Sequence, residues 1–178
     1  MIHNIISALG ARTNQYVKNK LSIDDDIVIV RNLVDIKGNL SQGIENKIVL
    51  FLLSIEEEKL AKNSTLSHSM SNPSINLNIN IMFATNFTDV NYVESLRNIS
   101  LIIDFFQRNP IFTLSDTPGL PLSIPRLHVE LYNLNMPDTM RLWGAIGTKY
   151  VPSCAYRIKQ VLFDSDTIIE DTPPVLGN

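Results

Sequence analysis

The three histidines carry the side chain that most often acts as a general base or a metal ligand near neutral pH. They stand far apart, at His3, His68 and His128, in a predicted helix start, a loop and a strand. A metal site on one helix or turn needs ligands a few residues apart, and a catalytic base needs a positioned partner. The histidines show neither pattern, so the sequence predicts no metal site and no catalytic base.

Acidic residues gather in two runs, at 24–26 and 56–58. A calcium loop needs oxygen ligands at alternating positions around a glycine turn, and neither run has that spacing. We interpret both runs as solvated charge at the ends of secondary structure elements.

Nucleophile and cofactor motifs are absent from the sequence. It has no P-loop, no nucleophile elbow and no Gly-rich dinucleotide turn. The single cysteine, Cys154, has no base nearby in sequence and is expected to be a small buried hydrophobe. It excludes an intrachain disulfide. The sequence therefore predicts no enzyme, no cofactor and no metal.

Length and charge narrow the class of protein further. The chain has 178 residues, a formal charge of −3 and 44% hydrophobic residues, which favours one globular domain. The net negative charge argues against the basic surface that binding to nucleic acid or an anionic membrane requires. Residues 1–21 lack the features of a signal peptide, and the longest apolar run, 48–55, is far shorter than the ~20 residues that span a bilayer. We expect a cytoplasmic protein.

Hydrophobic periodicity predicts three helices and five strands. In chain order they are a helix at 2–20, strands at 27–30, 46–60 and 75–83, a helix at 88–108, a strand at 127–132, a helix at 137–147 and a strand at 155–163. This order predicts an α+β fold, a single mostly antiparallel sheet with helices packed on it. Residues 63–74 and 111–125 are predicted loops. We expect one domain at 1–164 and a flexible acidic tail at 165–178.

Two faces of these elements have distinct chemistry. The strand at 75–83 alternates apolar residues with Asn76, Asn78 and Asn80, which predicts a hydrophilic face, solvated in a monomer or a wet interface in an assembly. The helix at 88–108 is expected to end before Pro110. Its predicted buried stripe consists of Val93, Leu96, Ile99, Ile103 and Phe106.

Aromatic residues are dense between positions 105 and 150. Phe105 and Phe106 are adjacent on one helix, and Phe112 lies in a Pro-rich loop. Trp143 and Tyr150 flank two glycines. One interpretation is a wide buried helix face with the loop folded back on the core. The other is a subunit interface, where aromatic residues are enriched.

Five short phrases occur in the same order as in one protein family. They lie at 44–47, 54–58, 82–87, 105–110 and 142–153. The phrases FFQRNP at 105–110 and LWGAIGTKYVPS at 142–153 are specific in combination. The chain resembles the N-terminal domain family of tail-terminator (cap) proteins from phage-tail-like extracellular contractile injection systems, such as the antifeeding prophage and the Photorhabdus virulence cassette. The resemblance covers about residues 2–164.

The resemblance implies a structural function. A cap of this family is expected to have the tail-terminator fold and to form a homohexameric ring on the distal end of the inner tube. There it would stop polymerisation and anchor the last sheath ring. Its partners would be itself, the inner tube protein and the sheath protein, without nucleic acid or membrane. It would be cytoplasmic during assembly and then part of a released particle.

A ring of this kind needs contact residues. We hypothesise that Phe105, Arg108, Phe112, Trp143 and Tyr150 belong to ring or tube contacts, because they are dense beside helix ends. We also expect the acidic tail to order on meeting the sheath or a neighbouring subunit. Three alternatives remain open at this point: a baseplate or sheath adaptor of the same machine, a small uncharacterised enzyme, and a regulator that never joins a particle.

Overall fold

The computed structural model describes residues 1–58, 75–87 and 91–163. Within them three helices and six strands follow the predicted order, with one short strand added. The elements are α1 (Ile2–Leu21), β1 (Val28–Val30), β2 (Lys47–Glu57), β3 (Ile75–Asn86), α2 (Tyr92–Arg108), β4 (Ile111–Thr113), β5 (Arg126–Leu131), α3 (Met136–Ile146) and β6 (Ser153–Phe163).

The strands form one sheet in the order β1-β2-β3-β6-β5-β4. β1 is parallel to β2 and the other neighbours are antiparallel. This confirms the predicted α+β class and its mostly antiparallel sheet. The three central strands have 11, 12 and 11 residues, whereas β1 and β4 have 3 each and β5 has 6. The flanking strands are therefore too short to cover the edges of the central ones.

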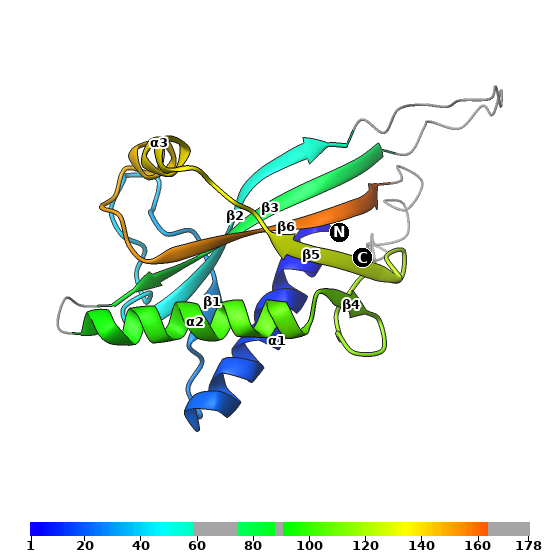
Figure 1. The fold of residues 1–178 in the computed structure, drawn as a ribbon, viewed down its shortest axis with the longest axis horizontal. Helices are drawn as coiled ribbons and strands as arrows, with labels where there is room; N and C mark the ends of the chain where they lie inside the picture. The colour runs from blue at the N-terminus through cyan, green and yellow to red at the C-terminus, as the bar shows by residue number, and fades with distance from the viewer. Residues whose placement is uncertain (59–74, 88–90, 164–178) are drawn as a thin grey trace, which may run out of the picture.

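Helices cover both faces of the sheet (Figure 1). α1 and α2 pack on one face, over a large core that includes Leu9, Leu50, Ile81 and Phe106. α3 lies on the other face, where Trp143 joins a smaller cluster. β2 contributes to both, since Ile48 and Leu50 face the large core while Val49 and Phe51 face the small one. The prediction that this strand is buried on both sides is confirmed.

Local signals set the ends of α3. The Asn135 side chain accepts a hydrogen bond of 2.8 Å from the backbone N–H of Asp138, which caps the first turn. Pro137 occupies the start of the helix, where its missing N–H costs nothing. Gly147 has a φ of 79° and ends the helix in the left-handed conformation. The predicted helix at 137–147 is confirmed for these reasons.

Residues 111–125 differ from the predicted surface loop. They begin with β4, and Phe112, Leu120 and Ile124 are buried in the large core. Arg12 of α1 holds this segment through Asp116 at 2.6 Å and Thr117 at 2.8 Å. A three-residue strand among prolines has no detectable periodicity, so only its pairing with β5 reveals it.

The predicted buried stripe of α2 is wrong for most of its residues. Ser95, Asn98, Ile102, Phe105 and Phe106 are the buried residues of this helix. From the predicted stripe only Phe106 belongs to that set, whereas Val93, Leu96 and Ile103 are exposed. The helix carries two apolar sides, and periodicity selected the one that faces away from the core.

The predicted hydrophilic face of β3 is also wrong where the strand crosses the sheet centre. Asn78 is buried and Asn80 has an exposed fraction of 0%. The Asn80 amide is held by Ser54, Glu56 and Arg157 from the two neighbouring strands. These neighbours supply the polar partners that burial of an amide requires, so no solvent is needed there.

Several predictions fall outside the described residues. They are the loop at 63–74, His68, and the boundary between the domain at 1–164 and the acidic tail at 165–178.

Candidate functional site

Phe105 and Phe112 belong to an aromatic cluster inside the large core. The ring of Phe105 lies 5.0 Å from that of Phe106 and 5.9 Å from that of Phe112. Phe106 in turn lies 4.3 Å from Tyr156 of β6. Both predicted contact residues are fully packed within the subunit, which favours the core interpretation of this aromatic group. That Phe105 and Phe112 contact another subunit stays a prediction, because neither side chain is exposed.

Trp143 and Tyr150 form a second aromatic pair, with ring centroids 5.6 Å apart. Trp143 lies on α3 and is buried in the small cluster. Tyr150 is exposed and follows the end of α3. Of this pair only Tyr150 has an accessible side chain.

Arg108 lies on the surface at the last turn of α2. Its Nε donates a hydrogen bond of 2.7 Å to Asp104, which also accepts one from the Tyr16 hydroxyl. These bonds, from Tyr16 first and then Arg108, hold the pKa of Asp104 below its ordinary value. The bond to Asp104 raises the pKa of Tyr16. The three side chains tie α1 to α2 and leave Arg108 accessible.

An apolar row runs along the outer side of α2. It contains Val93, with an exposed fraction of 74%, together with Leu96 and Ile103. Meanwhile Ser95 and Asn98 are buried on the inner side of the same helix. A solitary surface helix normally shows the opposite arrangement. The outer side of α2 is therefore an exposed apolar surface of the subunit.

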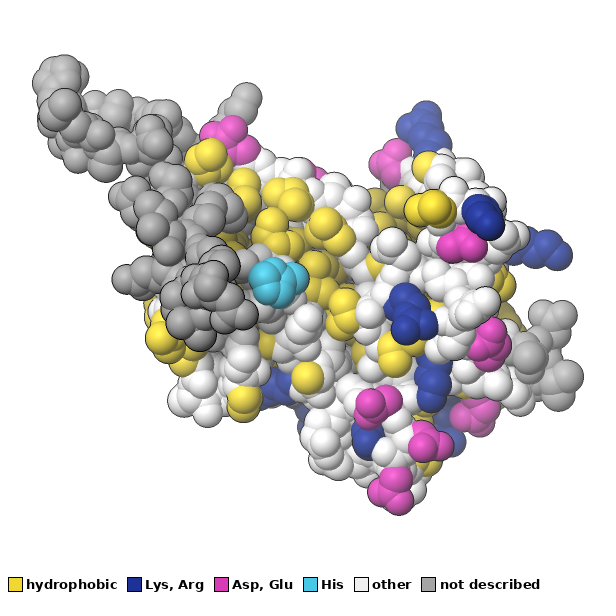
Figure 2. All heavy atoms as spheres, turned by 180° about the vertical axis from the view of Figure 1, so that it is seen from behind, with side chains coloured by type: hydrophobic (Ala, Val, Ile, Leu, Met, Phe, Trp, Pro, Cys, Tyr) yellow, Lys and Arg dark blue, Asp and Glu magenta, His cyan; other side chains and the backbone are white. Residues whose placement is uncertain are grey.

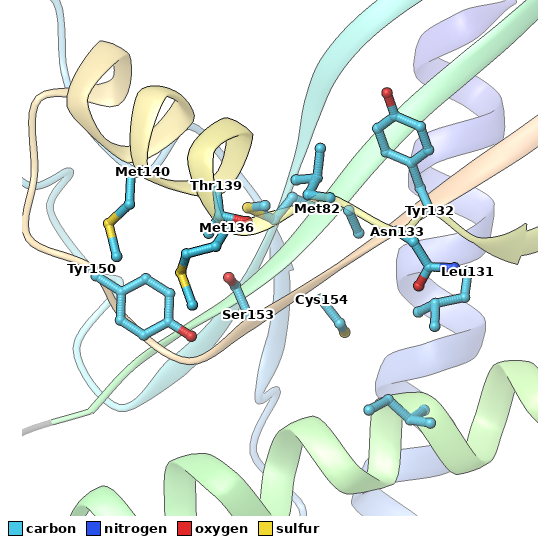
Figure 3. A pocket seen from close by; sticks show the side chains of 13 residues that line it. Met82, Leu131, Tyr132, Asn133, Met136, Thr139, Met140, Tyr150, Ser153 and Cys154 are labelled. Atoms are coloured by element: carbon cyan, nitrogen blue, oxygen red, sulfur yellow. The ribbon is translucent and has the colours of Figure 1, made fainter.

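A groove of about 510 Å³ continues this row toward α3. Ile103, Leu131, Met136, Met140 and Tyr150 supply its apolar wall (Figure 3). A second hollow of about 400 Å³ lies next to the groove and shares Ile103 and Leu131 with it. Ser153, Cys154 and Ala155 of β6 also line the groove, beside Asn133 and Leu134, which follow the end of β5. We call this surface the α2–α3 face and define it by Val93, Leu96, Ile103, Leu131, Met136, Met140 and Tyr150.

A second apolar surface lies at the other side of the sheet. β1 pairs with β2 only at Ile48–Leu50, so among the described residues β2 has no strand partner on that side from Leu52 onward. Val30, Leu52 and Ile55 are exposed there. Figure 2 shows hydrophobic side chains gathered over the region of β2 when the molecule is seen from behind. We call Val30, Leu52 and Ile55 the β2 edge.

Reactive groups do not converge in the described part of the chain. His3 and His128 are exposed and lie on different elements, and no group of three or more potential metal ligands occurs among the described residues. Burial raises the pKa of the Cys154 thiol to about 12, which makes it a poor nucleophile. No described helix is long and apolar enough to span a bilayer.

Of the five candidate contact residues, Arg108 and Tyr150 lie at the surface. Only Tyr150 belongs to the α2–α3 face, and the sequence analysis did not propose its other members as contact residues. Met136 and Met140 stand four positions apart on α3, which places them on one side of a helix. That spacing was a usable signal. Nothing in the sequence marked Leu131 as a surface residue, because it continues the alternation of β5 like a core residue.

Comparison with known proteins gave a family and a fold. The sequence profile of the Pvc16 N-terminal domain matches residues 5–177. The fold is similar to a structure described as the PVC sheath/tube terminator, in the extended state, of an extracellular contractile injection system. The TM-score is 0.59 at 15% identity, over 93% of this chain and 57% of that one.

A second similar structure is described as the anti-feeding prophage cap, a tube-terminating cap. Its TM-score is 0.51 at 14% identity, over 94% of this chain and 58% of that one. The chain therefore spans less than two thirds of the length of both relatives, and what it shares with them at this identity is the fold. No curated protein matches the sequence.

Proposed function

Because the chain belongs to the Pvc16 N-terminal domain family, we propose that it is a structural cap, or tail terminator, of a contractile injection system. The observation that carries this proposal is a fold shared, over nearly the whole chain, with two structures described as a terminator and a cap. The chain would form a homohexameric ring on the distal end of the inner tube. It would stop polymerisation of tube and sheath, anchor the last sheath ring, assemble in the cytoplasm and leave with the particle.

The surface of the described residues supports a role in assembly. The α2–α3 face and the β2 edge expose apolar side chains that a free monomer would bury. A cap that resists the pull of sheath contraction needs broad apolar contacts, because a surface ion pair contributes only about 1 kcal/mol or less. Both apolar surfaces meet that need.

The proposed role also agrees with the chemistry of the groove. Its polar lining includes Asn133, Thr139 and Ser153, beside a cysteine whose pKa is raised. A nucleophile requires an adjacent base, and no histidine lines this groove. The wall is suited to contact with apolar side chains, and we assign it to binding.

Deletion of the gene tests the proposal. Particles would be purified from wild-type cells and from cells that lack this chain, and tube and sheath lengths would be measured by negative-stain electron microscopy. We expect the deletion to give tubes of uncontrolled length or tubes without sheath. Density for the chain should lie at the end distal to the baseplate in wild-type particles.

Complementation supplies the control. Expression of the wild-type chain in the deletion strain should restore the length distribution. Normal capped particles without the chain would contradict the cap function. Density at the baseplate end would replace it with the adaptor function.

A further inference from the structure

Helix α3 is held to the rest of the subunit by much less than α1 or α2. Trp143 is its one buried residue, whereas seven residues of α1 and five of α2 are buried. α1 is also joined to other elements by side-chain bonds, such as Arg12 to Asp116 and Tyr16 to Asp104. Among the described residues, the side-chain hydrogen bonds and ion pairs of α3 stay within the helix and its cap. Apolar packing on the small cluster is therefore what holds α3 in place.

Open space lies along both sides of α3. The groove of about 510 Å³ follows the side that carries Met136 and Met140 (Figure 3). A hollow of about 280 Å³ follows the other side, beside Leu142 and Ile146, and reaches Leu52 of β2. Side chains that border open space lack part of their possible packing contacts. Little packing therefore has to be broken when this helix leaves the sheet.

The buried residue of α3 is itself incompletely satisfied. The Nε1–H of Trp143 is buried and has no hydrogen-bond acceptor in the described part of the chain. A buried donor without an acceptor is destabilising, because it has given up its hydrogen bonds to water. Movement of Trp143 into solvent restores such a bond and offsets part of the apolar burial that is lost. The unpaired donor thus lowers the cost of opening.

Two backbone hydrogen bonds set the ends of the segment that can move. Before α3, the N–H of Tyr132 donates to Ala155 at 2.9 Å, and after it, the N–H of Thr85 donates to Pro152 at 3.0 Å. Between these points, residues 133–151 form no backbone hydrogen bond with the other described residues. A helix of 11 residues is marginal on its own in water. The segment therefore loses its helical hydrogen bonds when it leaves the sheet.

We propose that residues 133–151 form a lid that opens from the sheet while the rest of the subunit stays folded. Opening uncovers the apolar face of the sheet beneath α3, which includes Met82 and Ala155. Local opening is expected where few apolar contacts hold a segment. The lid thus controls access to this face. The inference goes beyond the proposed cap function, and each can fail while the other stands.

Hydrogen exchange of the purified full chain, followed by mass spectrometry, tests the lid. The amides of Met140–Ile146 should exchange at least about a hundredfold faster than those of β3 and β6, because they need only local opening. Exchange at the rate of these central strands would overturn the proposal, since α3 would then open only when the whole subunit unfolds.

A mild change in the large core separates local from global opening. Ile102→Val removes one buried methyl group from α2, and it should speed exchange of β3 and β6 about two- to tenfold by lowering global stability. Exchange of α3 should not change, because lid opening leaves Ile102 buried. Equal acceleration of α3 and the central strands would overturn the proposal.

Labelling of a single thiol tests whether the face beneath the lid is uncovered. In a Cys154→Ala background, Met82→Cys places a thiol beneath the lid, and Ile81→Cys places one on the other face of the same strand. The wild-type residues have exposed fractions of 1% and 0%. Met82→Cys should react with a water-soluble maleimide about a hundredfold faster than Ile81→Cys. Equal rates would overturn the proposal, because α3 would then unwind without leaving the sheet.

A substitution in α3 links the two measurements. Gly144 lies inside the helix, and a Cβ added there has no neighbour within 4 Å. Gly144→Ala should stabilise the helix and slow both the exchange of α3 and the labelling of Met82→Cys by the same factor, about two- to fivefold. Ser100→Ala, at an exposed position of α2, is the matched control and should change neither rate. An unchanged rate for Gly144→Ala in either measurement would overturn the proposal.

Discussion

At the scale of single residues, the centre of the sheet contains a fully satisfied polar group. Asn80 donates to Ser54 at 2.9 Å and to Glu56 at 2.6 Å, and accepts from Arg157 at 3.0 Å. Arg157 also lies 4.5 Å from the ring centre of Tyr132. A buried amide without its partners costs about 1–3 kcal/mol, so each partner of Asn80 contributes to stability.

Replacement of Arg157 tests this arrangement. Arg157→Met should lower the free energy of unfolding by about 2 kcal/mol, because it leaves the buried Asn80 carbonyl without its donor and removes the cation paired with Glu56. Urea unfolding at neutral pH measures the change. Lys159→Met is the matched control, since Lys159 is more exposed than Arg157 and its loss breaks a surface pair with Glu130, which should cost less than about 1 kcal/mol. Equal losses in the two variants would show that the network around Asn80 adds nothing.

The acid dependence of stability depends in part on Asp104. Its pKa is lowered by the Tyr16 hydroxyl and the Arg108 guanidinium, so the folded state binds the proton less readily than the unfolded chain. Its contribution to stability is present above the ordinary pKa of about 4 and disappears as pH falls through the lowered value. Asp104→Asn should therefore reduce Tm at pH 7, and the difference from wild type should shrink in acid.

Thermal unfolding monitored across this pH range measures the effect. Glu94→Gln is a suitable comparison, because its pair with Arg97 is long at 3.6 Å and solvent-exposed. It should change Tm little at any pH. A difference for Asp104→Asn that persists undiminished in acid would contradict the assigned role of the carboxylate.

At the scale of elements, α2 shows why periodicity alone did not locate the core. Ile102, Phe105 and Phe106 face the sheet, whereas Val93, Leu96 and Ile103 face outward. Both sides are apolar at helical spacing, and the inner side begins with two polar residues, Ser95 and Asn98. A core and an interface both require apolar residues. Periodicity therefore found an apolar side of α2, but it took the exposed side for the buried one.

Substitutions on the two sides of α2 should have opposite consequences. Leu96→Lys should change the free energy of unfolding by less than about 0.5 kcal/mol, because its side chain is exposed in the monomer, yet it should impair incorporation into particles. Ile102→Ala should lower the free energy of unfolding by about 2–5 kcal/mol, because it opens a cavity in the core. Urea unfolding and the amount of chain in purified particles measure the two effects. Strong destabilisation by Leu96→Lys would contradict the assigned orientation of the helix.

At the scale of the whole molecule, the two apolar surfaces determine how an assembly should respond to salt. Both surfaces expose apolar side chains, so we expect the contacts of the proposed ring to be mainly apolar. We expect the purified chain to have the native mass of six chains, and that mass should not fall between about 0.05 M and 0.5 M salt, a range over which exposed charges become strongly screened. Sedimentation velocity measures it. Dissociation at the higher salt concentration would indicate that ion pairs hold the subunits together.

Sequence patterns by themselves determined the class and order of this fold. Strict alternation predicted the strands β3 and β6, Asn135, Pro137 and Gly147 predicted the ends of α3, and Pro110 predicted the end of α2; each of these elements was confirmed. The hydrophilic face that the alternation also predicted for β3 was not. The absence of spaced ligands and nucleophiles pointed away from an enzyme. The phrases at 105–110 and 142–153 pointed to the family that the profile then matched over residues 5–177.

Only the tertiary structure decided which apolar residues face inward. Phe105, Phe112 and Trp143 were candidates for an interface and are buried, whereas Leu131 and Met140 are exposed. The sequence shows which residues are apolar but not which of them face the core, because burial depends on which elements lie opposite one another. Here the short β1 leaves part of β2 without a strand neighbour among the described residues. On α2, the packing of Ile102 and Phe105 against the sheet leaves Val93, Leu96 and Ile103 on the outer side.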